Sequence, residues 1–184
     1  MKNLFKKPFL AIIVASFLLV GCGQAAPNLP EAEKNLQQYS TESGQLALNL
    51  ANQINIGEDG SANYEQIALK ANEAKEKFTE MKATLEALKV TDTADQTAFN
   101  AIVHVSNIAR ITAKVQELAN DAIDAAPGSE ELDQIVKQLN GLKTRLESSP
   151  AKFEELNQEL VEVMANPPEE AAPTDESSET PSEE

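Results

Sequence analysis

Apolar residues recur at alternating spacings of three and four between residues 31 and 166. The pattern is most regular in segment 63–89, at Tyr64, Ile67, Ala71, Ala74, Phe78, Met81, Leu85 and Leu88. A heptad seam of this kind is typical of helices that pack side by side. It predicts four helices, over about 31–55, 63–89, 93–125 and 129–166, with breaks at the glycines of 57–60, at 90–93 and at Pro127-Gly128.

Local signals refine the helix ends. Asn63 with Gln66, and Thr93 with Gln96, have the spacing of capping boxes, and Ser129 is placed as an N-cap. Pro150 interrupts the last segment, yet the three-four spacing continues through it. We favour one kinked helix packed on a single neighbour. A new helix with Ser149 as N-cap and Pro150 at its first position is equally compatible with the local sequence.

These segments predict an all-α fold, an antiparallel up-down four-helix bundle formed by residues 31–166. In such a bundle the start of the first helix and the end of the last share one end. Gly44 inside the first helix weakens it by about 1 kcal/mol relative to alanine.

The third helix has the widest apolar face. Its seam runs through Ala98, Ala101, Val105, Ile108, Thr112, Val115, Ala119 and Ala122, with Ile102, Ala109 and Ile123 on one flank and His104, Ile111 and Leu118 on the other. A wide face is what a central bundle helix needs. It also predicts an alternative, in which Ile111 and Leu118 form an unused apolar strip that binds a protein partner.

The N-terminal segment has a different pattern. Lys2, Lys6 and Lys7 precede an almost uninterrupted apolar run over 9–20, and Gly21 and Cys22 follow it. This is the arrangement of an export signal with a small residue at its cleavage site. Cys22 is the only cysteine, so it has no partner for an internal disulfide.

The stretch Leu19-Val20-Gly21-Cys22 resembles the lipobox of bacterial lipoproteins. The resemblance implies cleavage of a signal peptide, residues 1–21, diacylation of the Cys22 thiol, and N-acylation of the new amino end. Residues 22–30 would then be the lipidated cysteine and a linker, 23–30, which reaches about 25 Å when extended. We therefore expect an extracytoplasmic protein held to a membrane by lipid on Cys22.

The resemblance also bears on which membrane carries the protein. Gly23 stands where an aspartate would resemble an inner-membrane retention signal. In bacteria with two membranes this favours the outer membrane. In bacteria with one membrane the same anchor places the protein on the outer face of the cytoplasmic membrane.

Charge excludes some partners. The chain has a formal charge of -15, and loss of Lys2, Lys6 and Lys7 with the signal peptide, which contains no acid, takes it to -18. Such a field repels nucleic acid, so no nucleic-acid partner is expected. The segment 167–184 contains seven acids and no lysine or arginine, and its composition predicts a disordered tail.

The chain offers little catalytic chemistry. His104 is the only histidine, which excludes a multi-histidine metal site, and no carboxylates are paired in a diagnostic way. The simplest interpretation of His104 is a partly buried side chain at a helix boundary. The alternative is a haem ligand with Met81 or Met164 as its axial partner. A c-type attachment motif is absent.

We therefore predict a non-enzymatic, lipid-anchored helical interaction or structural module of the cell envelope, without a cofactor, that binds a protein partner or another copy. The alternative is a carrier or sensor of an apolar ligand or haem. Ala71, Ala74, Ala119 and Ala122 either leave a cavity for it or let the helices approach closely.

Overall fold

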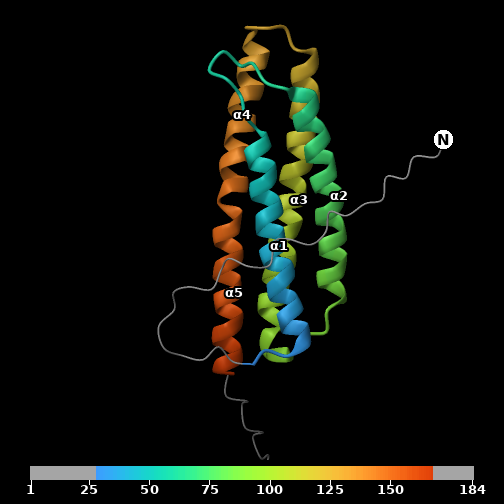
Figure 1. Cartoon of the computed structure of the whole chain (residues 1–184), viewed down its shortest axis with the longest axis vertical. Helices are drawn as coiled ribbons and strands as arrows, with labels where there is room; N and C mark the ends of the chain where they lie inside the picture. Colours follow the sequence, from blue (N-terminus) through green and yellow to red (C-terminus); the bar gives the residue numbers. More distant parts are fainter. Residues whose placement is uncertain (1–27, 168–184) are drawn as a thin grey trace, which may run out of the picture.

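The computed structural model describes residues 28–167, which fold entirely into helices and connections, without a strand in that range. The elements are α1 (Glu31–Gln53), α2 (Tyr64–Ala87), a 3₁₀ turn η1 (Asp92–Ala94), α3 (Asp95–Asp124), α4 (Glu130–Glu147) and α5 (Ser149–Ala165). They lie side by side in an elongated bundle (Figure 1). The predicted all-α class and helical bundle are confirmed. Residues 1–27, which include the predicted signal segment and Cys22, and the predicted tail from 168 onward lie outside the described residues.

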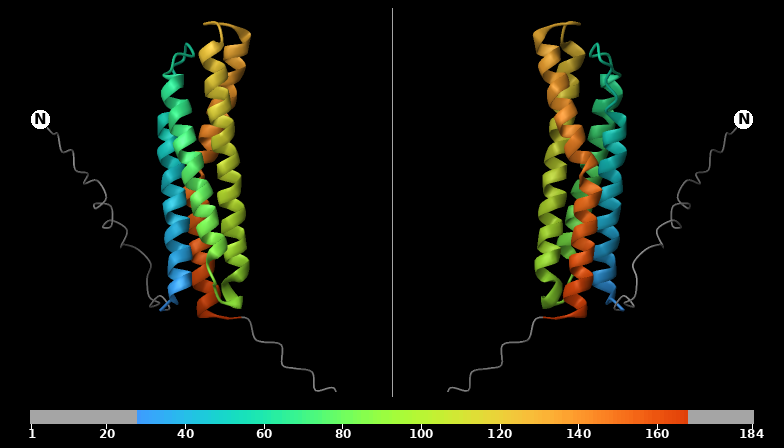
Figure 2. Two further views of the ribbon diagram at one scale, coloured as in Figure 1. Left: turned by 90° about the vertical axis from the view of Figure 1, so that its right-hand side faces the viewer. Right: turned by 90° about the vertical axis from the view of Figure 1, so that its left-hand side faces the viewer.

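The chain runs up α1, down α2, up α3 and down through α4 and α5 (Figures 1 and 2). The first and last described residues therefore lie at the same end of the bundle, which we call the entry end. Segments 54–63 and 125–129 lie at the opposite end, which we call the loop end. Among the described helices, none is both long and apolar enough to cross a membrane.

The predicted seams form the core. Every seam position of α3 from Ala98 to Ala122 is buried, and Phe78 of α2 is fully enclosed. The most extensive helix–helix contact of the described bundle is between α2 and α3. Ala71 and Ala119 have no exposed surface. Because an alanine side chain ends at Cβ, such positions let two helix backbones approach closely, which favours close packing over a cavity.

Two of the predicted helix starts are confirmed. Asn63 Oδ1 accepts a hydrogen bond from the Gln66 N–H at 3.0 Å, and Ser129 Oγ accepts one from the Leu132 N–H at 3.2 Å. The predicted capping box of Thr93 and Gln96 is not formed, so this prediction is wrong. Thr93 lies inside η1, which continues directly into α3, so it does not have the extended backbone that an N-cap requires.

The junction at Pro150 combines features of both alternatives. α4 ends at Glu147 and α5 begins at Ser149, so the helix is divided, but the single intervening residue Ser148 has nearly helical angles (φ -80°, ψ -11°). The chain therefore keeps its direction (Figure 1). Pro150 lies in the first turn of α5, where its missing N–H costs little. Ser149 is not the N-cap, because Ser148 occupies that position.

The expectation of a single neighbour for this last helical segment is also wrong. α4 packs on both α1 and α3, and α5 packs mainly on α1 and less on α3. In a bundle closed on itself, the fourth helix lies beside both the first and the third. The contact with α1 is close: a Cβ added to Gly44 would lie 3.1 Å from Pro150 Cα and 3.3 Å from Phe153 Cδ2. Gly44 weakens its helix locally but makes room for α5.

This close approach predicts opposite effects of alanine at two helical glycines. Gly141→Ala in α4 meets nothing within 4 Å, so we expect it to stabilise the fold by about 0.5–1 kcal/mol through helix propensity. Gly44→Ala gains the same propensity but crowds α5, and overpacking costs about 1–3 kcal/mol. We expect a net loss of stability there. Urea denaturation followed by circular dichroism measures both, and a Gly44→Ala protein as stabilised as Gly141→Ala would contradict the packing.

Candidate interaction surface

The flank of α3 that carries Ile111 and Leu118 is covered. Ile111 is 8% exposed and Leu118 is 3% exposed, so both belong to the core and form no free strip. His104 lies on the same flank and contacts Ser149 and Phe153 of α5. The last helical segment therefore covers this side of α3. The prediction that Ile111 and Leu118 form a partner interface is wrong for this reason.

The large apolar side chains that remain exposed lie on α2 and on other parts of α3. Within residues 28–167 they are Leu69, Phe99, Val103 and Ile123, exposed by 52%, 59%, 42% and 44%. We call these four residues the exposed apolar set. Phe99 and Val103 are four residues apart on α3, so they share one face of the helix. Packing within the described bundle covers less than 60% of the surface of each of these side chains.

Leu69 and Ile123 also line a shallow hollow between α2 and α3 near the loop end, with a volume of about 370 Å³. Its other lining residues are Glu65, Ala68, Asn72, Gln116 and Asn120. We call it the α2–α3 hollow, and it is widely open to solvent.

The polar wall of the α2–α3 hollow is held by hydrogen bonds between the two helices. Gln116 Nε2 donates to Asn72 Oδ1 at 3.1 Å, and Lys75 Nζ donates to Gln116 Oε1 at 2.9 Å. These bonds fix the orientation of two amide side chains between two apolar residues. The hollow therefore combines apolar walls with an ordered polar wall, a combination common at protein interfaces.

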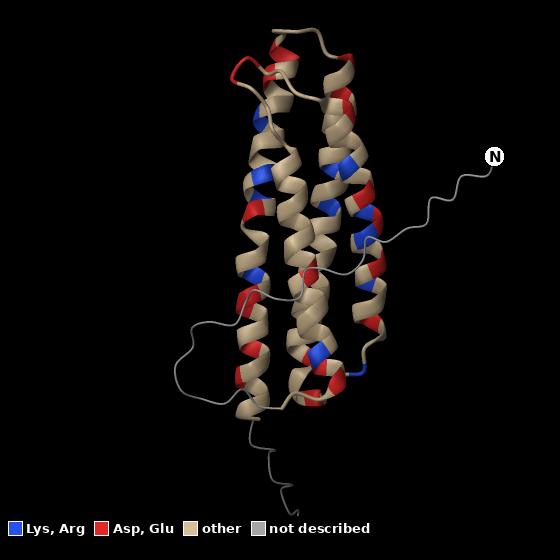
Figure 3. Ribbon diagram, in the orientation of Figure 1, with Lys and Arg blue, Asp and Glu red and all other residues tan. Residues whose placement is uncertain are grey.

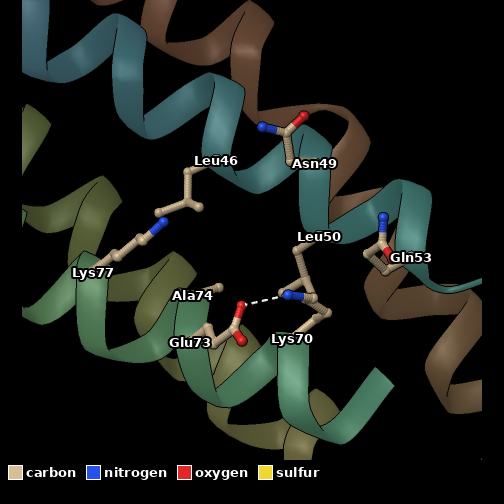
Figure 4. A pocket seen from close by; sticks show the side chains of 8 residues that line it. All are labelled: Leu46, Asn49, Leu50, Gln53, Lys70, Glu73, Ala74 and Lys77. Carbon is tan, nitrogen blue, oxygen red and sulfur yellow. Dashed lines mark hydrogen bonds and ion pairs between the residues drawn. The ribbon is translucent and has the colours of Figure 1, made fainter. Parts of the chain in front are cut away.

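A second groove lies between α1 and α2, with a volume of about 190 Å³ (Figure 4). Leu46, Leu50 and Ala74 supply its apolar surface, and Asn49 and Gln53 lie along α1. On α2, Lys70 pairs with Glu73 at 2.7 Å, and Lys77 extends across the groove toward Leu46. The volume of this α1–α2 groove is below the roughly 300–1,000 Å³ of typical ligand pockets, and the groove lies at the bundle surface.

His104 is half-buried between α3 and α5. Its Nε2 lies 3.2 Å from Ser149 Oγ, and its ring meets the Phe153 ring edge-on at a centroid distance of 4.6 Å. Burial, and then the positive charge of Lys152, hold the pKa of His104 below its usual value. These contacts agree with the interpretation of His104 as a partly buried side chain at a helix boundary.

The two methionines considered as haem ligands have other partners. Met81 Sδ accepts a hydrogen bond from Ser43 Oγ at 3.3 Å, between α1 and α2. Met164 Sδ accepts one from Thr91 Oγ1 at 3.5 Å, beside the entry end. His104 is bonded to Ser149, so each of the three side chains contacts a different part of the bundle. None of these contacts brings His104 together with a methionine as a pair of axial haem ligands.

The lowered pKa of His104 predicts a pH effect on stability. Because the unfolded chain takes up the proton near pH 6.5 and the folded chain takes it up only at lower pH, protonation favours unfolding. We expect the contribution of neutral His104 to the free energy of unfolding to be fully present above pH 6.5. It should be lost as the pH drops toward the pKa of His104 in the folded protein. In His104→Gln this dependence should vanish between pH 7.5 and 5.5. Equal slopes of the urea midpoint against pH in both proteins would contradict the assignment.

The sequence did not reveal a buried acid at the entry end. Glu33 in the first turn of α1 is 1% exposed, and its Oε1 accepts a hydrogen bond from the Thr91 N–H at 2.7 Å. Its Oε2 is buried without a hydrogen-bond partner in the described structure. The available signal was its position, three residues before the core residue Leu36 and therefore on the same helix face.

Within residues 28–167, no group of three or more histidine, cysteine, aspartate or glutamate side chains is placed to hold a metal ion. No protein-family model, no curated protein and no solved structure matches this chain.

Proposed function

We propose that this protein is a lipid-anchored, non-enzymatic interaction module of the bacterial cell envelope. The observation that carries the proposal is that the exposed apolar set lies entirely on α2 and α3, with Leu69 and Ile123 at the α2–α3 hollow and Phe99 and Val103 near the start of α3. Such side chains on one helix pair favour association with another protein, because their burial removes apolar surface from water.

The anchor would set the orientation of the bundle. A lipidated Cys22 precedes the first described residue by six positions, and the linker 23–30 reaches only about 25 Å when extended. The entry end would therefore sit near the membrane, and the loop end would point away from it. In that orientation the α2–α3 hollow is on the part of the bundle that an approaching partner meets first.

Neutral substitutions on the exposed apolar set test this function. We expect Leu69→Asn with Ile123→Asn, and separately Phe99→Asn with Val103→Asn, to reduce complexes of the full chain on native gels of solubilised membranes. A control pair, Gln134→Asn with Gln138→Asn on exposed positions of α4, should leave them intact. Hot-spot residues typically account for a loss of about tenfold or more. Complexes unaffected by both apolar pairs, in variants of unchanged helicity, would reject this function.

A carrier or sensor of an apolar ligand is the second candidate, and the α1–α2 groove is the feature that favours it. Native mass spectrometry of the gently purified protein tests it. A bound molecule lost on Leu46→Asn with Ala74→Asn would support the carrier. Bare protein mass from cells grown with haem and fatty acid would count against it.

A further inference from the structure

We propose that the α2–α3 hollow docks a protein segment that presents an apolar side chain flanked by lysine or arginine. The inference rests on the proposed function and adds to it the place of docking and the chemistry of the partner. It is built on the apolar walls of the hollow, on its ordered amides and on the distribution of charge along the bundle.

The apolar part of the recognition comes from both helices. Leu69 of α2 and Ile123 of α3 each line the hollow and are each about half exposed. An apolar side chain placed between them would cover both. The hollow is open and shallow, which suits a side chain carried on a protein surface more than a small molecule that must be enclosed.

The polar part is already ordered. Asn72 and Gln116 are tied to each other and to Lys75 across the helix pair, so their orientation is fixed before a partner arrives. Asn120 lines the hollow beside them and is exposed. Groups held in place in the free protein lose less freedom on binding, which improves affinity without adding contacts.

The charge around the hollow selects the partner. The loop end together with the helix ends beside it, residues 54–69 and 115–136, contains nine acids and no lysine or arginine. Figure 3 shows acidic residues in the connecting loop and at the helix ends there. Glu65 lines the hollow and is exposed, and Asp124, also exposed, lies beside the hollow, one helical turn after Asn120. Neither carboxylate belongs to one of the four salt bridges of the described residues.

The nearest charges on α2 do not reverse this field. Among residues 28–167, Lys75 is the one cation hydrogen-bonded to the hollow's amides, and Glu76 accepts a hydrogen bond from Asn72 at 3.0 Å. A basic partner would therefore be attracted and oriented, whereas a second copy would bring the same acids against this end. The charge argues for a basic segment of another protein over self-association.

Two synthetic amphipathic helical peptides provide the probe, one of leucine and lysine and one of leucine and glutamate. They are titrated by fluorescence anisotropy into the whole mature chain, residues 22–184 with Cys22→Ser. We expect only the leucine–lysine peptide to bind, and amide chemical shifts of the labelled protein to change around Leu69 and Ile123.

Three variants separate this site from general attraction to an acidic protein. Leu69→Asn with Ile123→Asn should weaken peptide binding about tenfold. Glu65→Gln with Asp124→Asn should weaken it and flatten its dependence on salt. The control, Glu147→Gln with Glu162→Gln on exposed positions of α4 and α5, removes the same charge and should change affinity less than twofold.

Equal effects of the two charge pairs, or binding that is insensitive to Leu69 and Ile123, would overturn the docking site. So would a dimer, seen by sedimentation without peptide, that these substitutions dissociate. If the peptide result fails but complexes in membranes still depend on the exposed apolar set, the partner chemistry is wrong and the proposed function stands. If neither depends on that set, both fail.

Discussion

Cys22→Ser is expected to abolish lipid attachment completely, and to release from the membrane fraction the protein that has lost residues 1–21. A serine hydroxyl cannot form the thioether through which a lipoprotein carries its diacylglycerol. Each buried methylene of an acyl chain contributes about 0.8 kcal/mol to membrane binding, so loss of the chains removes nearly all of it.

Labelling with radioactive palmitate, followed by fractionation, measures both effects. The matched control is Gln24→Ser, two residues further along, which introduces the same side chain and should leave labelling and fractionation unchanged. A Cys22→Ser protein that still incorporates palmitate would show that the lipobox interpretation is wrong. One that has lost residues 1–21 and the label but stays with the membrane would indicate a second means of attachment.

The second large effect is expected from Phe78→Ala. Phe78 lies in the seam of α2 with no exposed surface, so its truncation removes a buried ring and leaves a cavity. Such changes cost about 3–5 kcal/mol, which is a large part of the 5–15 kcal/mol that stabilises a typical domain. Urea denaturation monitored by circular dichroism at 222 nm measures the loss.

Phe99→Ala is the same chemical change at a site exposed by 59%, and we expect it to alter stability by less than about 0.5 kcal/mol. If Phe99→Ala destabilises the isolated protein as much as Phe78→Ala, then Phe99 is part of the core and not of a binding surface. Phe78→Ala should weaken association only to the extent that the protein unfolds.

The heptad seam predicted the bundle and its core well, because burial follows the three-four spacing directly. It could not decide which flank of α3 is covered. Ile111 and Leu118 lie on one side of that seam and Ile123 on the other, and the sequence alone presents two similar apolar flanks. The packing of α2 on one side of α3, and of the last helical segment, α4 and α5, on the other, decides that Ile111 and Leu118 are buried and that Ile123 is half exposed.

Other differences also come from long-range packing. From its local sequence, Gly44 is expected only to weaken its helix. Its role in making room for Pro150 depends on a residue more than 100 positions away. From the sequence, Glu33 is expected to be one more solvated acid of a first helical turn. In the structure it is buried, and its carboxylate accepts a hydrogen bond from the backbone N–H of Thr91. Thr93 has the spacing of a capping residue, yet η1 occupies its place. Local patterns contain none of these contacts.

The central claim, that the surface of α2 and α3 binds another protein in the envelope, is tested most directly by photo-crosslinking in living cells. A photoreactive amino acid is placed at Leu69 in the full, lipidated chain, and at Gln138 on the exposed side of α4 as the control. We predict a discrete adduct between this protein and another polypeptide from position 69 and none from position 138. No adduct from position 69, or the same adducts from both positions, would contradict the account.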